Sequence, residues 1–343
     1  MPDAPDGREE SGMKSEAKKL VLVSPATAAS NNGNWHTAHR WAGFLSGHCD
    51  TALLTQWPEE TAAAAGLVHH SEPVAMIALH ARRSAPSIRA WADAWPGKPL
   101  IVVLTGTDLY RDIQTDLEAQ HSLAVASQLV VLQDAGLAAL PSVWRSKAQV
   151  IYQSAPALVP LQKSERTFCA VMVGHLRDEK DPLTFMRAAS SGFAAGVRFV
   201  QIGEALEPSL GEAAQKAASL TRAYRWLGGL PRAATRQHIR RAHVLVSCSR
   251  MEGGAHVILE AVQSGTPVLA SHISGNIGML GVGYAGYFTL GDAAGLAALL
   301  RRCAQERDFL ALLQKQCSER ARLFDPAEEK RRVIALAMGE NKT

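Results

Sequence analysis

The sequence of 343 residues is poor in cysteine and has no closely spaced cysteine pair. Its five cysteines are scattered along the chain, at Cys49, Cys169, Cys248, Cys303 and Cys317. A secreted disulfide scaffold needs a dense and usually even set of cysteines, and a structural zinc site needs Cys-x-x-Cys spacing. Both classes are therefore excluded. Scattered single thiols are typical of a reducing compartment, so we predict a cytoplasmic protein.

The chain also lacks an unbroken apolar run that could cross a membrane or direct secretion. Residues 261–291 contain no Asp, Glu, Lys or Arg, but several glycines and Pro267 interrupt them, so they cannot form an apolar spanning helix. The N-terminal segment is polar and has no hydrophobic stretch of the kind found in a signal peptide. We expect residues 1–17 to form a flexible polar tail, and we expect no membrane insertion.

There is little excess charge of either sign. The 36 Lys and Arg residues nearly balance the 32 Asp and Glu residues, which gives a formal net charge of +4. Aromatic residues make up only 6% of the chain and are not interleaved with basic clusters, which argues against a nucleic-acid-binding protein. Hydrophobic residues make up 47%, and the length corresponds to about two domains at ~150 residues each.

Short apolar segments recur along the chain and alternate with segments of helical periodicity. The strand candidates are residues 20–23, 75–79, 100–104, 129–132 and 149–152 in the first half, and 167–173, 198–202, 221–227, 244–247 and 267–270 in the second. Strands that alternate with helices predict parallel sheets. The sequence therefore predicts an α/β fold with two Rossmann-like doubly wound domains that face a cleft.

The proline-containing segment 156–165 marks the boundary between these domains. We expect an N-terminal domain over residues 18–158 and a C-terminal domain over residues 159–324. Asp325 and Pro326, followed by Glu328 and Glu329, are typical of a helix N-terminus. Residues 325–343 are therefore predicted to form a C-terminal helix, which we expect to pack back on the N-terminal domain.

The sharpest local motif contains two glutamates, Glu252 and Glu260, with Gly253 and Gly254 between them. A helix that begins near Gly254 would leave bare backbone amides at its N-terminus, which suits an anion such as a diphosphate. The two carboxylates are about two helical turns apart and can face the same side. On spacing alone, a simpler alternative is slightly favoured, in which Glu252 caps the helix and Glu260 is a polar surface residue.

This segment resembles the E-x7-E signature of family 4 glycosyltransferases, retaining enzymes of the GT-B fold that use nucleotide sugars. The loop from Gly174 to Lys180, the segment around Gly228 and residues 285–292 resemble further motifs of that family, in the same order along the chain. The resemblance implies that residues 159–324 bind a UDP-sugar. The implied donor-binding residues are Gly174, His175, Arg177, Lys180, Gly228, Glu252, Gly253, Gly254, Ala255 and Glu260.

One departure from the family pattern concerns the diphosphate. Family members commonly have an arginine where this chain has His175, so we expect Arg177 and Lys180 to supply the positive charge. The alternative for Arg177 is a solvated loop charge. Lys180 has the spacing from Gly174 that the family loop requires.

No motif indicates a metal or a dinucleotide cofactor. The chain has no Asp-x-Asp pair of the kind that holds Mn²⁺ in metal-dependent sugar transferases, and no P-loop. The histidine pairs at 36/39 and 69/70 lack accompanying carboxylates or cysteines. Residues 281–286 fit the G-x-G-x-x-G pattern, but an extended segment follows them instead of a helix. We therefore expect no cofactor and no metal.

Three polar segments in the first half, residues 31–36, 78–84 and 104–111, follow predicted strands and should converge at one sheet edge. The phrases ALHARRS and LTGTDLYRD within them closely resemble one branch of family 4, the selenosugar synthases of selenoneine biosynthesis, and this resemblance covers nearly the whole chain. It implies that residues 18–158 bind selenophosphate. The implied acceptor-binding residues are Asn32, Gly33, Asn34, His80, Arg82, Arg83, Thr105, Gly106, Thr107, Asp108 and Arg111.

Within this set the expected roles differ. Adjacent side chains at a strand end rarely both point inward, so we expect one of Arg82 and Arg83 to bind and the other to support it. His80 is either a substrate ligand, which we favour, or a buried structural histidine. Asp108 should orient its own loop or an arginine, because a free carboxylate would repel an anionic acceptor.

The resemblances together imply transfer of a sugar from UDP-glucose or UDP-N-acetylglucosamine to selenophosphate, which gives a 1-seleno-sugar, UDP and phosphate. The residues expected to be catalytic are Glu252, Lys180, Arg177 and His80. An ionised selenophosphate needs no protein base, unlike an alcohol. Two alternatives stay open: a conventional retaining family 4 enzyme with a hydroxyl acceptor, and a nucleotide-sugar-binding protein without turnover.

Overall fold

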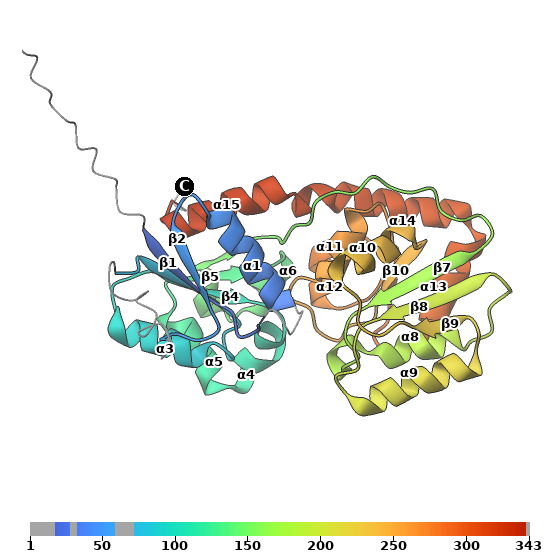
Figure 1. The fold of residues 1–343 in the computed structure, drawn as a ribbon, viewed down its shortest axis with the longest axis horizontal. Coiled ribbons are helices and arrows are strands. Elements are labelled where there is room, and N and C mark those ends of the chain that lie inside the picture. Colours follow the sequence, from blue (N-terminus) through green and yellow to red (C-terminus); the bar gives the residue numbers. More distant parts are fainter. Residues whose placement is uncertain (1–17, 28–32, 59–71, 341–343) are drawn as a thin grey trace, which may run out of the picture.

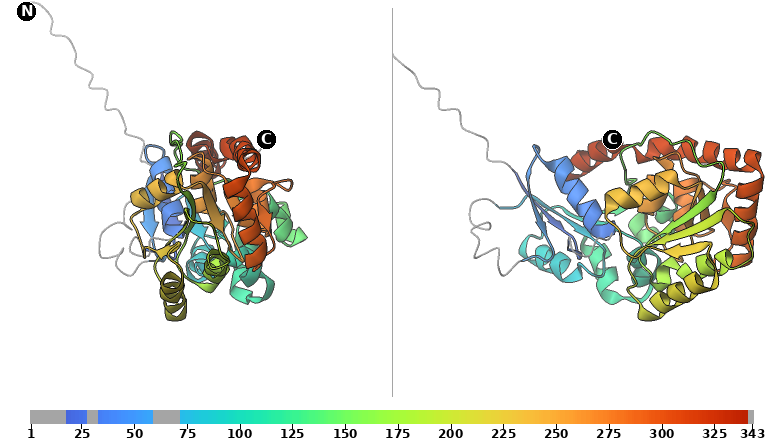
Figure 2. Two further views of the ribbon diagram at one scale, coloured as in Figure 1. Left: turned by 90° about the vertical axis from the view of Figure 1, so that its right-hand side faces the viewer. Right: turned by 45° about the vertical axis from the view of Figure 1, so that its right-hand side comes forward.

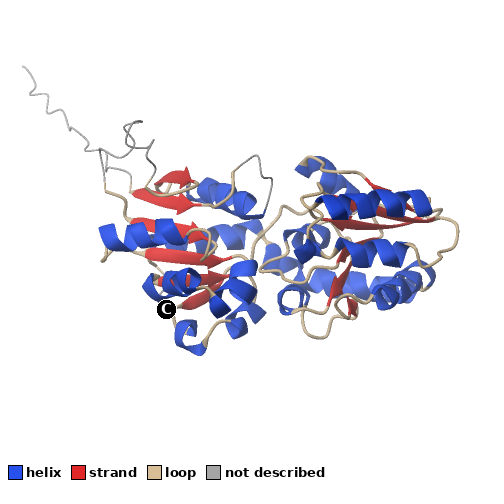
Figure 3. Cartoon of the chain, turned by 90° about the horizontal axis from the view of Figure 1, so that it is seen from below, coloured by secondary structure: helices blue, strands red, loops and turns tan. Residues whose placement is uncertain are grey.

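The computed structural model describes residues 18–27, 33–58 and 72–340, which form two lobes placed side by side (Figure 1). The predicted tail, residues 1–17, and the predicted acceptor residue Asn32 lie outside the described residues. Each lobe contains one six-stranded sheet in which all strand pairs are parallel. Helices surround both groups of strands (Figure 3). The fold is therefore α/β with two doubly wound halves, as predicted.

The first sheet has the strand order β2-β1-β3-β4-β5-β6. Its strands are β1 (Lys19–Val23), β2 (Asp50–Leu54), β3 (Ala75–Leu79), β4 (Leu100–Leu104), β5 (Gln128–Val131) and β6 (Ala148–Val150). The helices of this lobe are α1 (Gly33–Leu45), α3 (Ala85–Ala94), α4 (Ile113–Thr115), α5 (Leu117–Val125), α6 (Ala135–Ala139) and α7 (Ser142–Arg145), with a helical turn η2 (Asp108–Asp112). The strand order reverses between β1 and β3, which in such sheets marks the ligand-binding edge.

The second sheet has the order β12-β11-β10-β7-β8-β9 and reverses between β7 and β10. Its strands are β7 (Phe168–Val173), β8 (Val197–Ile202), β9 (Tyr224–Trp226), β10 (Val244–Ser247), β11 (Val268–Ser271) and β12 (Tyr287–Phe288). The helices are α8 (Pro182–Ala189), α9 (Pro208–Leu220), α10 (Arg232–Arg241), α11 (His256–Val262), α12 (Ser274–Leu280), α13 (Ala293–Gln305), α14 (Arg307–Arg320) and α15 (Pro326–Met338), with short turns η3 (Asp178–Lys180) and η4 (Ala321–Phe324).

Burial on both faces explains why the central strands are continuously apolar. Every residue of β3 and of β4 is buried. One face of the first sheet packs under α3 and α5, around Trp91 and Leu123, and the other packs under α1 and α15, around Trp41 and Val333. Parallel strands that are covered on both faces consist of unbroken hydrophobic runs, and this pattern allowed them to be predicted from the sequence.

The last helix, α15, leaves the second lobe and lies against α1 of the first (Figures 1 and 2). Asp325 caps it by accepting a hydrogen bond from the Ala327 backbone amide, and Pro326 occupies its first turn. Glu329 on this helix is almost fully buried, and its carboxylate pairs with Arg40 at 2.8 Å and accepts a hydrogen bond from the Trp41 indole at 2.7 Å. A buried ion pair with several hydrogen bonds thus joins α15 to the first lobe.

Candidate active site

A cavity of about 530 Å³ is lined by residues from both lobes. The loops after β4, β7 and β10 contribute to it, together with the first turn of α10 and part of α11. β7 and β10 are the strands between which the second sheet reverses its order. The cavity therefore lies where doubly wound sheets bind their ligands. Another cavity, of about 610 Å³, is lined by Lys163, His243 and Arg301 among others, and none of the predicted site residues lines it.

Most of the predicted site residues line this cavity between the lobes. From the first lobe these are Gly33, Asn34, Arg83, Thr105, Gly106 and Thr107. From the second lobe they are Gly174, His175, Arg177, Lys180, Glu252, Gly254 and Glu260. The other predicted site residues within the described part of the chain do not line this cavity, and their assignment to the site stays a prediction; they are His80, Arg82, Asp108, Arg111, Gly228, Gly253 and Ala255.

The Glu252 carboxylate is held by two neighbours. Its Oε1 lies 2.5 Å from the Lys180 ammonium nitrogen and accepts a hydrogen bond of 2.5 Å from the Ser249 hydroxyl. Lys180 comes from the loop after β7, and Glu252 from the loop after β10. The stem of Lys180 passes over Gly174, whose φ of +155° is open mainly to glycine. The two loops at the reversal point of the sheet are thus joined by one charged pair.

Glu260 lies in a buried, positively charged environment. Its Oε1 is 3.1 Å from the Arg232 Nε, 3.9 Å from the Arg236 Nε and 3.6 Å from the His256 Nε2. Burial raises the pKa of Glu260, and the two arginines act against this shift. α11 begins at His256, two residues later than expected, so Glu252 precedes the helix and only Glu260 belongs to it. Both carboxylates nevertheless reach the same cavity.

The sequence analysis missed several residues of the cavity. They are His36, Glu179, Glu204, Arg232, Thr235 and His256. Burial, with the positive charges of Arg232 and Arg40, lowers the pKa of His36 to about 4. Arg232 opens α10 directly after Pro231, and a basic residue at a helix start after the predicted Gly228 segment was the available signal.

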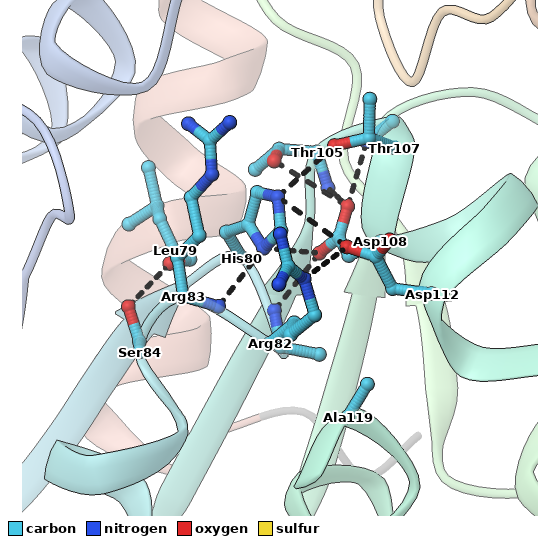
Figure 4. Close-up of polar contacts among 12 residues, drawn as sticks. Leu79, His80, Arg82, Arg83, Ser84, Thr105, Thr107, Asp108, Asp112 and Ala119 are labelled. Carbon is cyan, nitrogen blue, oxygen red and sulfur yellow. Dashed lines mark hydrogen bonds and ion pairs between the residues drawn. The ribbon is translucent and has the colours of Figure 1, made fainter. Parts of the chain in front are cut away.

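Asp108 organises the first-lobe loops from inside the protein. Its Oδ1 accepts hydrogen bonds from the backbone amides of Thr105 and Gly106, and its Oδ2 accepts one from Ala81, all at 2.9 Å. Asp108 is fully buried, and these contacts agree with the expectation that it orients its own loop. Its carboxylate ties the turn after β4 to the turn after β3, as Figure 4 shows.

His80 is buried between the same two turns and does not line the cavity. Its Nε2 lies 3.0 Å from the Thr107 hydroxyl, and its Nδ1 accepts a hydrogen bond of 3.2 Å from the Arg83 backbone amide (Figure 4). Burial lowers the pKa of His80, although the nearby Asp108 acts in the opposite direction. Both ring nitrogens have protein partners, which favours the alternative of a buried structural histidine over a direct substrate ligand.

Of the three predicted acceptor arginines, only Arg83 lines the cavity. Arg82 donates from Nε to Asp112 at 3.0 Å, and Arg111 pairs with Asp112 at 3.0 Å and with Glu179 at 3.5 Å. This arrangement is consistent with the expectation that one of Arg82 and Arg83 binds and the other supports it, and the role of Arg111 stays a prediction.

Three residues of the predicted donor set also have other surroundings. Gly253 packs against the first lobe: a Cβ built on it would lie 2.4 Å from the Thr105 carbonyl carbon. Ala255 is buried in front of α11. Gly228 has a φ of +66° and precedes Gly229, which does line the cavity. The donor-binding roles of these three residues stay predictions.

The described residues contain no group of three His, Cys, Asp or Glu side chains that could hold a metal ion. In the same part of the chain, no helix combines the length and the apolar composition of a membrane span.

Comparison with solved structures shows the same overall architecture. HepE from Anabaena in complex with UDP-glucose has a TM-score of 0.72 at 16% identity, over 94% of this chain and 99% of HepE. Sucrose-phosphate synthase from Thermosynechococcus elongatus has a TM-score of 0.71 at 16% identity, over 94% and 98%. The lipopolysaccharide outer core galactosyltransferase WaaB has a TM-score of 0.66 at 13% identity, over 94% and 99%.

Comparison of the sequence with family models gives a match for the second lobe. No curated protein matches the chain. Residues 158–324 match the family described as glycosyl transferases group 1, and this range contains the cavity residues Gly174, Lys180, Glu252 and Glu260. The protein therefore has the GT-B fold, and its residues 158–324 are similar to the group 1 family of glycosyl transferases.

Proposed function

We propose that this protein transfers a sugar from a UDP-sugar to selenophosphate and so forms a carbon–selenium bond. The donor would be UDP-glucose or UDP-N-acetylglucosamine, and the products a 1-seleno-sugar, UDP and phosphate. In the transfer, the C1–O bond of the donor breaks and its electron pair leaves with UDP, while selenium forms the new bond to C1. Water then cleaves the selenium–phosphorus bond, which releases phosphate and leaves the selenol of the sugar.

The observation that carries the donor half of this proposal is the ion pair between Lys180 and Glu252 in the cavity, within the region that matches the family. Lys180 and the adjacent Arg177 would stabilise the charge that develops on the departing diphosphate, where preorganised donors have their largest effect. Glu252 would accept hydrogen bonds from the donor sugar. Glu260, from α11, would accept hydrogen bonds from the ribose hydroxyls. Solved relatives of similar fold contain UDP or UDP-glucose.

The acceptor half rests on the chemistry of the first-lobe wall. Among its described residues, the first lobe contributes no carboxylate to the cavity lining. It contributes instead the guanidinium of Arg83 and the hydroxyls of Thr105 and Thr107. This composition favours an anion on the first-lobe side of the cavity, because that side offers charge-assisted hydrogen bonds and its described lining residues carry no negative charge. An acceptor that is already ionised also needs no general base.

The test is a UDP-release assay on the full chain with each UDP-sugar and a panel of acceptors: selenophosphate, thiophosphate, phosphate, simple alcohols and none. We expect release that depends on selenophosphate, and a product whose ⁷⁷Se NMR signal couples to the anomeric proton. Release that ignores selenophosphate but responds to an alcohol would instead identify a conventional hydroxyl-acceptor enzyme. Tight UDP binding without consumption of any UDP-sugar would identify a binding protein.

A further inference from the structure

The hydrogen-bonding partners of His80 determine which of its ring nitrogens carries the proton. The Arg83 backbone amide can only donate, and it points at Nδ1 from 3.2 Å, so Nδ1 must present a lone pair. Burial lowers the pKa of His80, which favours the neutral ring. In a neutral imidazole the other nitrogen bears the hydrogen. Nε2–H is therefore the donor in the 3.0 Å contact with the Thr107 hydroxyl oxygen.

The Thr107 hydroxyl oxygen thus accepts a hydrogen bond from His80. The hydroxyl hydrogen does not take part in that bond and can go to another partner. Thr107 lines the cavity, whereas His80 does not. Among the described residues, the Thr107 hydroxyl makes no hydrogen bond besides the one with His80. Its hydrogen is therefore available to a ligand in the cavity.

The backbone of His80 supports the same arrangement. His80 has a φ of +72°, a left-handed conformation that costs energy for a residue other than glycine. Its neighbour Asp108 fixes the turn through the Ala81 amide, and the Ser84 hydroxyl donates to the Leu79 carbonyl at 2.6 Å on the other side (Figure 4). Such strain persists where the surroundings over-determine it, and here it directs the ring toward Thr107.

We propose that His80 is a positioning residue that makes Thr107 a hydrogen-bond donor to an oxygen of the anionic acceptor, while its Nδ1 holds the backbone that presents Arg83. This inference rests on the proposed function for the identity of the acceptor. The Thr107 hydroxyl and the Arg83 guanidinium then both donate hydrogen bonds. The site therefore selects a ligand whose oxygens all accept them. Thr107 contacts the acceptor, and His80 acts through Thr107.

The first test measures binding of inorganic phosphate to the full chain saturated with UDP, by isothermal titration calorimetry. Thr107→Val keeps the side-chain shape but removes the hydroxyl, and we expect phosphate binding about 10-fold weaker or more, as for the loss of one charge-assisted hydrogen bond. Thr107→Ser keeps the hydroxyl and should bind phosphate within about 2-fold of the wild type. UDP affinity should be unchanged in both variants. Phosphate binding by Thr107→Val at the wild-type level would overturn the proposal.

The second test separates positioning from simple structural support. Asparagine tolerates a left-handed backbone, so His80→Asn keeps the turn, and His80→Gly serves if the first variant does not fold. We expect His80→Asn to weaken phosphate binding about as much as Thr107→Val, and to add little in the Thr107→Val background. Losses that simply add in the double variant would show that His80 does not act through Thr107 and would overturn its assigned role.

These measurements need no turnover, so the two proposals can fail separately. If selenophosphate is not consumed but phosphate binding still depends on Thr107 and His80, the proposed function is wrong and the positioning role stands. If selenophosphate is consumed and its KM does not respond to Thr107→Val, the proposed function stands and the positioning role is wrong. With turnover present, we expect Thr107→Val to raise the KM for selenophosphate and to leave the KM for the UDP-sugar unchanged.

Discussion

Glu260 is a single buried carboxylate with Arg232, Arg236 and His256 around one of its oxygens. Replacement of Glu260 by Gln keeps its volume but weakens the hydrogen bonds that we assign to the ribose hydroxyls. We predict that Glu260→Gln raises the KM for the UDP-sugar about 10-fold or more. Steady-state kinetics of UDP release would measure this, with the exposed Glu212→Gln on α9 as the matched control. A folded Glu260→Gln protein with unchanged donor kinetics would contradict the assignment.

Lys180 should affect the rate of sugar transfer, because we assign it to the leaving diphosphate. Lys180→Met removes a cation at the point where negative charge develops, and it also leaves the mostly buried Glu252 without its charged partner. We predict a kcat ~100- to 1,000-fold lower, the range seen when one transition-state donor is removed. The control is Lys216→Met on the exposed side of α9. An unchanged kcat in the folded variant would remove Lys180 from the mechanism.

His36, which lines the cavity, should make the stability of the folded protein depend on pH. Its pKa is lowered to about 4 in the folded protein, whereas an unfolded histidine titrates near ~6.5. Between these values the unfolded state binds a proton that the folded state does not, so the contribution of His36 to stability is present above the unfolded pKa and is lost as pH falls toward about 4. We predict that His36→Gln loses less Tm than the wild type between pH 7 and pH 5 in thermal denaturation. Parallel losses in both proteins would argue against this role.

For single residues, the sequence predicted which ones lie near the site but not where their side chains point. The motif around Glu252 and Glu260 predicted both carboxylates in one cavity, because residues after strands meet at one sheet edge. The direction of His80 could not be predicted, since it depends on a left-handed φ, on the Arg83 amide of its own turn and on the Thr107 hydroxyl of a neighbouring turn. The pairing of Arg82 with Asp112 likewise joins two turns that are far apart in the sequence, so no local pattern encodes it.

Among the elements, α15 offers the clearest test of stability. Glu329 on this helix is 2% exposed, and its carboxylate is bound by Arg40, Trp41 and Ser154. Its neighbour Glu328 is paired only with Arg331 and Arg332 on the exposed side of the helix. Glu329→Ala leaves Arg40 without its buried partner, and we predict a loss of about 3–5 kcal/mol in the free energy of unfolding. Glu328→Ala, the matched control, should cost less than about 1 kcal/mol. Urea denaturation would measure both, and equal losses would contradict this account.

The success of the sequence analysis at the level of elements depended on burial. Strands covered on both faces, such as β3, β4 and β10, were predicted within one residue because every side chain is buried and nearly all are apolar. β2 was missed because this edge strand is largely open to solvent and begins with a charged residue, Asp50. β12 was missed because only two residues pair. The short α11 began later than expected, because Gly253 and Gly254 are held in the loop by contacts with the first lobe.

At the scale of the whole molecule, two loops from different lobes meet backbone to backbone. A Cβ on Gly253 would lie 2.4 Å from the Thr105 carbonyl carbon, and a Cβ on Gly106 would lie 2.9 Å from the Gly253 amide nitrogen. We predict that Gly253→Ala separates the donor and acceptor loops, so kcat falls at saturating substrates while UDP affinity is kept. Gly283→Ala is the control, since nothing lies within 4 Å of a Cβ at that position. Titration of UDP beside steady-state kinetics would measure both variants, and a fully active Gly253→Ala enzyme would show that this approach is not required.

The return of α15 to the first lobe also has a consequence for biosynthesis. Val333 and Leu336 on α15 are buried in the same cluster as Leu20, Trp41 and Ile77. Since the ribosome makes α15 only after the whole second lobe, the first lobe leaves the exit tunnel with one face of its sheet covered by α1 but not yet by α15. That part of the face stays open until residues 326–338 arrive, so the lobe that is translated first reaches its final packing last.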